Sequence, residues 1–236
     1  MKSMPHSSNL SPAQVFKVED LVRIGEGGKR VVYEHPEDPS KLIKVTKPRD
    51  PVTENGLFDR LADVLDFDTR QRAISKEIKE YERVVALERR GFGVSPIAHM
   101  YGYAATDRGP ALVVEKIASH DGNIAQSLRQ IRSRRTLDLN EHKALNIFAR
   151  KLLDLNVRAS DLTSANIVLG YRFTDNPNPT LEAVLVDGYG DTHLIPVRAW
   201  SRRLNALSNH RRLHRIAQFL RLQWDEQTRL FSLSQG

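Results

Sequence analysis

Hydrophobic and polar positions alternate along the chain from about residue 21 onward. Such alternation predicts strands, because successive side chains of a strand point to opposite faces. The first strands are expected at residues 21–27, 29–35 and 42–45. Gly25, Gly27 and Gly28 stand between the first two. Because glycine tolerates conformations that other residues avoid, this connection is expected to be a flexible hairpin turn.

A helical period follows, with apolar residues at Ile74, Ile78, Tyr81 and Val85 and with Gly91 at the expected stop. Another strand pair is then expected at residues 96–107 and 110–117. The strands and this helix predict a first lobe, which is interrupted by an insertion at about residues 46–70. The pattern contains no clue to the role of the insertion.

The pattern changes class after Lys116, where helical periods replace strands. Leu145, Phe148, Leu152 and Leu155 lie on one face of the strongest of these helices. Two shorter apolar runs predict strands, and most of the remaining chain reads as a basic helix. The prediction is an α+β fold with two lobes. Its boundaries are a flexible tail at 1–18, an N-terminal lobe at 19–117 and a C-terminal lobe at 118–236 that ends in the basic helix.

Composition narrows this picture. The chain has 236 residues, 40% of them hydrophobic, which suffices for a continuous core. It contains no cysteine, which excludes disulfides, thiolate metal sites and a cysteine nucleophile. The first residues lack the apolar segment of a signal peptide, and no run is long enough to span a membrane. We therefore expect a cytoplasmic protein without membrane contact.

The glycines of the first hairpin could hold a phosphate, because backbone N–H groups can approach it where no side chain intervenes. Gly25, Gly27 and Val32 match the protein kinase signature G-x-G-x-x-G-x-V, whereas Arg30 replaces its third glycine. Gly28 adds a further glycine to the loop. Taken alone, the motif is as well explained by a tight turn.

Lys44 lies in the next apolar strand, where the kinase lysine meets the α- and β-phosphates. The alternative is a lysine exposed on a half-buried strand. Glu77 lies between Ile74 and Tyr81 on the packed face of the predicted helix and is our candidate partner for Lys44. Glu80 is expected to point further toward solvent and is kept in reserve.

Two further motifs supply oxygen ligands. Asp161 and Asn166 have the D-x-x-x-x-N spacing of a kinase catalytic loop, and Asp187 closes an apolar strand. Asp161 would accept a proton from a hydroxyl, while Asn166 and Asp187 would bind Mg²⁺ together with triphosphate oxygens. The alternatives are ordinary turns, since Asp, Asn and Asp-Gly all favour them.

Residues at the junction of the two predicted lobes are candidates for binding a base. We expect Glu115 and Ile117 to present backbone groups to adenine, with Val32 above the ring. All the motifs occur in the order and local structure that a kinase requires, which favours a bilobal protein kinase-like fold with a small antiparallel N-lobe sheet, one main helix and a reduced, mostly helical C-lobe. The expected ligand is ATP with Mg²⁺.

More distinctive segments resemble the YrbL family, also called PhoP regulatory network proteins. They are GGKRVVYEHPEDPSKLIKV, KEIKEYERV, LVVEKI, SANIVLG and VLVDGYGDTHLIPVRAW. The resemblance covers most of the chain from about Leu21. It implies a kinase-like two-lobed fold with Lys44, Glu77, Asp161, Asn166 and Asp187 at the kinase core positions. It also implies a bacterial origin, but it does not by itself establish phosphoryl transfer.

The phosphoryl acceptor is left open by the sequence. Ala159 stands where kinases have the histidine of H-R-D, the A-P-E motif is missing, and little chain follows Asp187. A small hydroxylated molecule and a protein are therefore equally suitable acceptors. The main rival hypothesis is a catalytically silent kinase-like regulator that acts through a protein partner.

A lesser alternative is a nucleic-acid-binding module. The formal net charge is +7, and seven arginines gather near the C-terminus: Arg198, Arg202, Arg203, Arg211, Arg212, Arg215 and Arg221. Apolar residues interleave with them: Trp200, Leu204, Leu207, Leu213, Ile216 and Leu220. We prefer an amphipathic helix with a solvated basic face, and do not expect nucleic acid as a partner.

Overall fold

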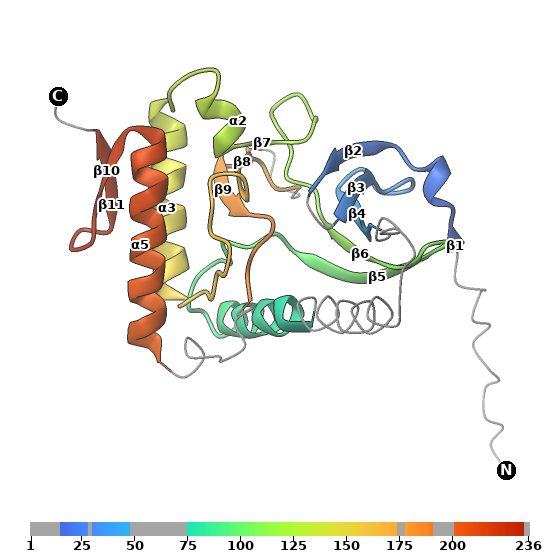
Figure 1. Ribbon diagram of the computed structural model, residues 1–236, viewed down its shortest axis with the longest axis horizontal. Helices are drawn as coiled ribbons and strands as arrows, with labels where there is room; N and C mark the ends of the chain where they lie inside the picture. The colour runs from blue at the N-terminus through green and yellow to red at the C-terminus, as the bar shows by residue number, and fades with distance from the viewer. Residues whose placement is uncertain (1–14, 28–29, 48–74, 174–177, 191–200, 234–236) are drawn as a thin grey trace, which may run out of the picture. The chain divides into compact units, whose positions relative to one another are not determined.

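The computed structural model describes residues 15–27, 30–47, 75–173, 178–190 and 201–233. These residues form a mixed α+β structure, as the sequence predicts (Figure 1). The chain folds into two compact units. The first comprises Met1–Pro48 and Met100–Glu115, and the second comprises Arg49–His99 and Lys116–Gly236. The expected insertion lies almost wholly outside the described residues.

A six-stranded sheet makes up the first unit. Its strands are β1 (Val15–Phe16), β2 (Arg23–Glu26), β3 (Arg30–Glu34), β4 (Lys41–Thr46), β5 (Met100–Thr106) and β6 (Gly109–Glu115), and a 3₁₀ turn, η1 (Val18–Asp20), follows β1. The spatial order is β1-β5-β6-β4-β3-β2. All neighbours are antiparallel except β1 and β5, which are parallel. Because β1 pairs with β5, regular structure begins inside the segment 1–18 that was expected to be a tail.

The sheet buries one apolar cluster: Val18, Leu21, Tyr33, Ile43, Val45 and Ala111. Ile43 and Val45, two positions apart on β4, both lie in this cluster, as expected for one face of a strand. A polar turn precedes β4, where Asp38 accepts a hydrogen bond from the Ser40 N–H at 2.9 Å and pairs with Lys41 at 2.9 Å. The pKa of Asp38 lies well below its usual range, chiefly because its carboxylate accepts a hydrogen bond from the Ser40 hydroxyl and, to a smaller extent, from Lys41.

The second unit begins, in its described part, with a helix at residues 75–89. The other helices are α2 (Leu128–Arg132), α3 (Leu139–Asp154) and α5 (Arg202–Leu220), and the strands are β7 (Gln126–Ser127), β8 (Ile167–Gly170), β9 (Glu182–Leu185), β10 (Leu222–Asp225) and β11 (Leu230–Leu233). The 75–89 helix ends as predicted, since Gly91 adopts φ +82° and its N–H donates to the Glu88 carbonyl. No described helix is long and apolar enough to cross a membrane.

Helix α3 confirms its predicted apolar face. Leu145, Phe148 and Leu152 are all at most 1% exposed. The helix begins at a capping box, in which the Asp138 carboxylate accepts from the N–H groups of Asn140 and Glu141. Antiparallel strands β7, β8 and β9 lie nearby, with α3 contacting β9.

The C-terminal end differs from the sequence prediction. The chain does not end in the basic helix, because the hairpin β10–β11 follows α5. Trp224 and Phe231 pack with ring centroids 4.8 Å apart, and the Phe231 N–H donates to the Asn146 side chain of α3 at 2.6 Å. Only Arg221 separates α5 from β10, and no glycine or proline stands between them, so the alternating signal was not separated from the helical period before it.

Candidate functional site

The candidate catalytic loop and the Asp-Gly segment lie side by side in the second unit. Residues 161–166 precede β8, and residues 186–190 follow β9, its antiparallel neighbour. The Asp161 N–H donates to the Gly188 carbonyl at 2.9 Å, and the Val186 N–H donates to the Asn166 carbonyl at 2.9 Å. The pairing of β8 with β9 therefore continues past the ends of the strands and brings Asp161, Asn166 and Asp187 together.

Gly188 is required for this close approach. Its φ is +79°, a conformation that side chains rarely adopt. A Cβ built on Gly188 would lie 2.5 Å from the Asp161 carbonyl oxygen and 2.9 Å from Asn166 Nδ2. The Asp-Gly pair is therefore more than a loop turn, because the glycine allows the two acidic segments to meet.

The side chain of Asn166 has a defined orientation. Its Nδ2 donates to the Asp161 carbonyl at 2.8 Å and to Asp161 Oδ2 at 2.9 Å. Since the amide nitrogen faces Asp161, the amide oxygen points away from that carboxylate. Asp187 Oδ1 accepts from the Gly188 N–H at 2.8 Å. The set offers carboxylate and amide oxygens, which are the hard ligands that Mg²⁺ prefers.

The described residues hold no cluster of three or more His, Cys, Asp or Glu side chains suited to a metal. A metal at Asn166 and Asp187 would therefore have to complete its shell with ligand or water oxygens. This composition is common for Mg²⁺, which usually keeps several waters and takes few protein ligands.

Glu80 corrects one sequence expectation. Its side chain is 2% exposed rather than turned toward solvent. It accepts two hydrogen bonds from the Arg83 guanidinium, at 3.0 and 2.6 Å, and one from the Arg158 N–H at 2.8 Å. Arg83 lies one helical turn away and could have been paired with Glu80 from the sequence, whereas the Arg158 segment that covers the carboxylate lies 78 residues further along the chain.

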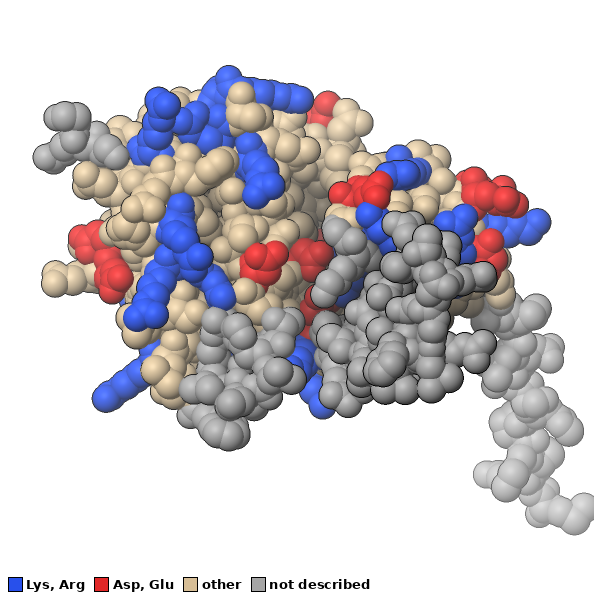
Figure 2. Space-filling view, viewed as in Figure 1, with Lys and Arg blue, Asp and Glu red and all other residues tan. Residues whose placement is uncertain are grey.

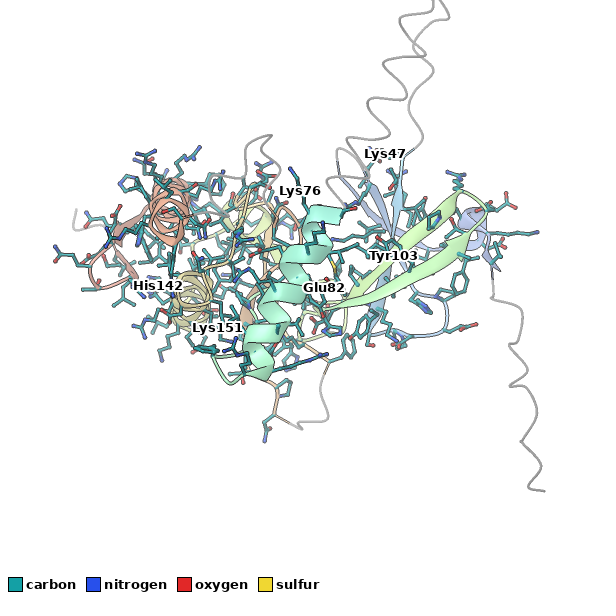
Figure 3. All side chains as sticks on the ribbon, turned by 90° about the horizontal axis from the view of Figure 1, so that it is seen from below. Lys47, Lys76, Glu82, Tyr103, His142 and Lys151 are labelled. Carbon is teal, nitrogen blue, oxygen red and sulfur yellow. The ribbon has the colours of Figure 1, made fainter. Side chains whose placement is uncertain are left out.

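These contacts join the 75–89 helix to the segment that leads into Asp161. Arg83 also donates to the carbonyls of Leu155 and Asn156, at 3.2 and 2.9 Å. Gly190 lies against the same helix, because a Cβ there would be 2.9 Å from the carbonyl of Lys76. Figure 3 labels Lys76 near the first described turn of the helix and Glu82 further along it. The sequence pattern did not indicate a functional role for Arg83, Arg158 or Gly190.

The other predicted residues of the helix and sheet lie as follows. Glu77 is 8% exposed, as expected for the packed face of the helix. In the first unit Lys44 is 8% exposed and lies in register with Val32 on β3 and Leu112 on β6. Gly25 pairs with Val32, and the Gly27 N–H donates to the Arg30 carbonyl at 2.8 Å. Gly28 lies outside the described residues. The Lys44–Glu77 pair stays a prediction.

Glu115 ends β6, and Ile117 follows it as a residue only 2% exposed. The Ile117 carbonyl accepts from the Ala125 N–H at 2.9 Å, whereas its own N–H donates to no other described residue. Ile117 packs in an apolar cluster with Ala98, Ala125, Val168 and Val184. A buried backbone donor is normally paired, so this N–H is suited to a ligand.

Comparison with known proteins identifies the family. The model of the PhoP regulatory network protein YrbL family matches residues 17–221. The protein named "Uncharacterized protein YrbL" from Escherichia coli strain K12 is 28% identical over 191 residues, which cover 80% of each chain, and the protein of the same name from Shigella flexneri matches to the same extent. The chain belongs to the PhoP regulatory network protein YrbL family.

Proposed function

We propose that this protein binds Mg-ATP and transfers the γ-phosphoryl group to a hydroxyl acceptor. The observation that supports the proposal best is the docking of the Asp161 loop onto the Asp187 segment through paired backbone hydrogen bonds. Phosphoryl transfer requires positioning and charge neutralisation more than covalent chemistry. Two rigidly joined acidic loops, one at the acceptor and one at the metal, meet that requirement.

In this proposal Asn166 and Asp187 hold the magnesium. The orientation of Asn166 supports the assignment, because Asp161 accepts both hydrogen bonds from its amide nitrogen and leaves the amide oxygen directed elsewhere. Bound magnesium would neutralise charge on the phosphate oxygens. Asp161 has a separate role, in which its carboxylate orients the acceptor hydroxyl and takes the proton that the hydroxyl loses. The hydroxyl oxygen bonds to the γ-phosphorus as the bond from that phosphorus to the β,γ-bridging oxygen breaks, and ADP leaves with the bridging oxygen.

The proposal assigns the rest of the nucleotide to residues predicted from the sequence. Lys44 meets the phosphates with Glu77 as its partner, and Gly25, Gly27 and Gly28 approach them through backbone N–H groups. Val32 lies over the adenine. Glu115 and Ile117 present backbone groups to its edge. The buried N–H of Ile117, which donates to no other described residue, supports the last assignment.

The acceptor is a small hydroxylated molecule or a protein. A second function, a kinase-like regulator without turnover, is favoured by the family description, which refers to a PhoP regulatory network. Such a protein would act through a partner, and its nucleotide site would serve binding alone. Binding of nucleic acid remains the weaker alternative, and retention on DNA or RNA at low salt would be its signature.

The test is an assay of ATP hydrolysis and autophosphorylation with Mg²⁺ and with Mn²⁺. Asp161→Ala and Asp187→Ala are assayed in parallel to exclude a contaminating ATPase. Activity in the parent that both variants lack supports the proposal. If the parent and both variants bind Mg-ATP equally and none shows activity, the enzyme hypothesis fails and the regulator hypothesis replaces it.

A further inference from the structure

The buried face of α5 carries polar side chains that the proposed function does not use. Asn205 and Asn209 are 0% and 1% exposed, although the sequence pattern placed leucines on the packed face. Leu204 and Leu207, expected to be part of that face, are instead 46% and 44% exposed. The helix contains no Asp, Glu or Lys, and its arginine side chains contribute to the basic area visible over α5 in Figure 2.

Three polar side chains of this face, those of Asn205, Asn209 and Arg212, donate to the chain segment 156–159. Asn205 Nδ2 donates to the Val157 carbonyl at 3.0 Å and to Asn156 Oδ1 at 2.9 Å. Asn209 Nδ2 donates to the Val157 carbonyl at 2.9 Å. Arg212 donates to the Ala159 carbonyl. These residues occupy positions i, i+4 and i+7, which lie on one side of a helix.

The geometry of an extended segment explains why α5 reaches these carbonyls. Backbone carbonyls at alternate positions point to the same side, so those of Val157 and Ala159 can both face α5. Arg158 points its backbone groups the other way, with its N–H on Glu80 at 2.8 Å and its carbonyl accepting from the Gly190 N–H at 2.7 Å. The segment is therefore held from two sides just before Asp161.

Burying the two amides is costly, and an apolar residue would avoid their unpaired oxygens but would leave the Val157 carbonyl without these donors. The Oδ1 atoms of Asn205 and Asn209 are buried and have no hydrogen-bond partner among the described residues. Unpaired buried acceptors destabilise a fold. The donors on the same side chains must therefore contribute something that packing alone would not, namely a fixed position of the 156–159 backbone.

We propose that Asn205, Asn209 and Arg212 are positioning residues that fix the Asp161 loop for phosphoryl transfer; the inference rests on the proposed function. They touch neither nucleotide nor acceptor. They hold the 156–159 segment, whose Arg158 carbonyl pairs with Gly190 and whose continuation pairs Asp161 with Gly188. Displacement of this segment would shift Asp161, whereas Asn166 and Asp187 are also held by the pairing of β8 with β9 and by the hydrogen bond from the Val186 N–H to the Asn166 carbonyl.

The test compares Asn209→Ala and Arg212→Met with Arg211→Met, a matched control because Arg211 is exposed on the same helix. Turnover, Mg-ATP affinity and backbone amide exchange are measured well below the unfolding temperature. We expect kcat to fall on the order of tenfold or more in the first two variants, with Mg-ATP affinity retained. Exchange of the Arg158 and Asp161 amides should rise on the order of tenfold, and exchange in α3 should be unchanged.

Arg212→Lys distinguishes the loss of this hydrogen bond from a general folding defect in Arg212→Met. An ammonium group can still donate to the Ala159 carbonyl and should restore part of the turnover. Parental kcat in both Asn209→Ala and Arg212→Met, or exchange that rises evenly over the unit, would overturn the inference. If the parent itself transfers no phosphoryl group, the proposed function fails. The exchange measurement then decides alone, since a local rise supports the positioning of residues 156–159 by α5 and an unchanged or uniform pattern refutes it.

Discussion

The two compact units hold their candidate site residues by different means. In the first unit, the candidates Val32 and Lys44 are register partners on β3 and β4, and Lys44 is also paired with Leu112 on β6, so the backbone ladder fixes both candidates. In the second unit, Asp161 and Asp187 depend on hydrogen bonds from loops and side chains that are distant in the sequence. The strands of a hydrogen-bonded ladder can be predicted from the alternation of residues along the chain. A network of long-range hydrogen bonds forms only once the tertiary fold brings its members together.

The largest expected effect is that of Asp187→Ala. We expect it to abolish metal-dependent ATP binding, because one of only two proposed protein ligands is lost. Calorimetric titration with ATP in the presence and absence of Mg²⁺ measures this directly. Asp154→Ala is the control, since that carboxylate is 58% exposed and pairs with Arg229 away from the site. Equal Mg²⁺ dependence in both variants would remove Asp187 from the metal site.

Asp161→Ala should separate chemistry from binding within the second unit. We expect kcat to fall roughly 10²- to 10⁴-fold, the usual contribution of a general base, while Mg-ATP affinity changes little. Steady-state kinetics and calorimetry on one preparation measure both quantities. A loss of Mg-ATP affinity as large as that of Asp187→Ala would show that Asp161 also serves binding, and the two carboxylates would not have separate roles.

Lys44→Met tests the first unit, in which the paired strands of the sheet hold Lys44. Nucleotide affinity or turnover should fall far more than the free energy of unfolding, because the lysine serves the phosphates rather than the sheet. Lys41→Met on the same strand is the control, since Lys41 pairs with Asp38 in the turn. If Lys44→Met binds and turns over ATP like the parent, Lys44 has no phosphate-binding role.

Glu80→Gln measures how far the second unit relies on its polar network. Glutamine keeps the volume but leaves Arg83 and Arg158 without a carboxylate, so the free energy of unfolding should fall by about 2 to 3 kcal/mol. Glu82→Gln, an exposed position on the same helix, should change it by less than about 0.5 kcal/mol. Chemical denaturation compares the two, and equal stabilities would contradict the importance of this network.

The sequence predicted most of the ladder and only part of the network. Strands β2 to β6, helix α3 and the end of the 75–89 helix follow from period, glycine and capping signals. The close approach of Gly188 to Asp161, the burial of Glu80 and the donors of α5 could not be predicted, because their partners lie up to 78 residues away. Asn205 and Asn209 even opposed the apolar pattern, since they occupy buried positions where a leucine would be expected.

The smallest expected effect concerns the turn after Ile117. Hydrogen bonds from the side chains of Ser119 and Asn123 lower the pKa of Asp121 to about 2. Because the folded pKa lies below the unfolded value of about 3.9, the turn's contribution to stability is complete above that value and is lost as the pH falls toward 2. Titration of the Asp121 carboxyl by NMR should show this midpoint. Ser119→Ala should raise it, and an unchanged midpoint would show that Ser119 is not its cause.

The most direct test of the central claim locates the metal–nucleotide complex on the protein. Mn²⁺-ATP is added to ¹⁵N-labelled protein, and paramagnetic broadening of each backbone amide resonance is recorded against Mn²⁺ alone and ATP alone. We expect selective broadening at Asn166, Asp187 and Gly188 that requires both components, with β10 and β11 unaffected. Broadening centred elsewhere, or equal broadening by Mn²⁺ alone, would contradict a metal–nucleotide site at Asn166 and Asp187.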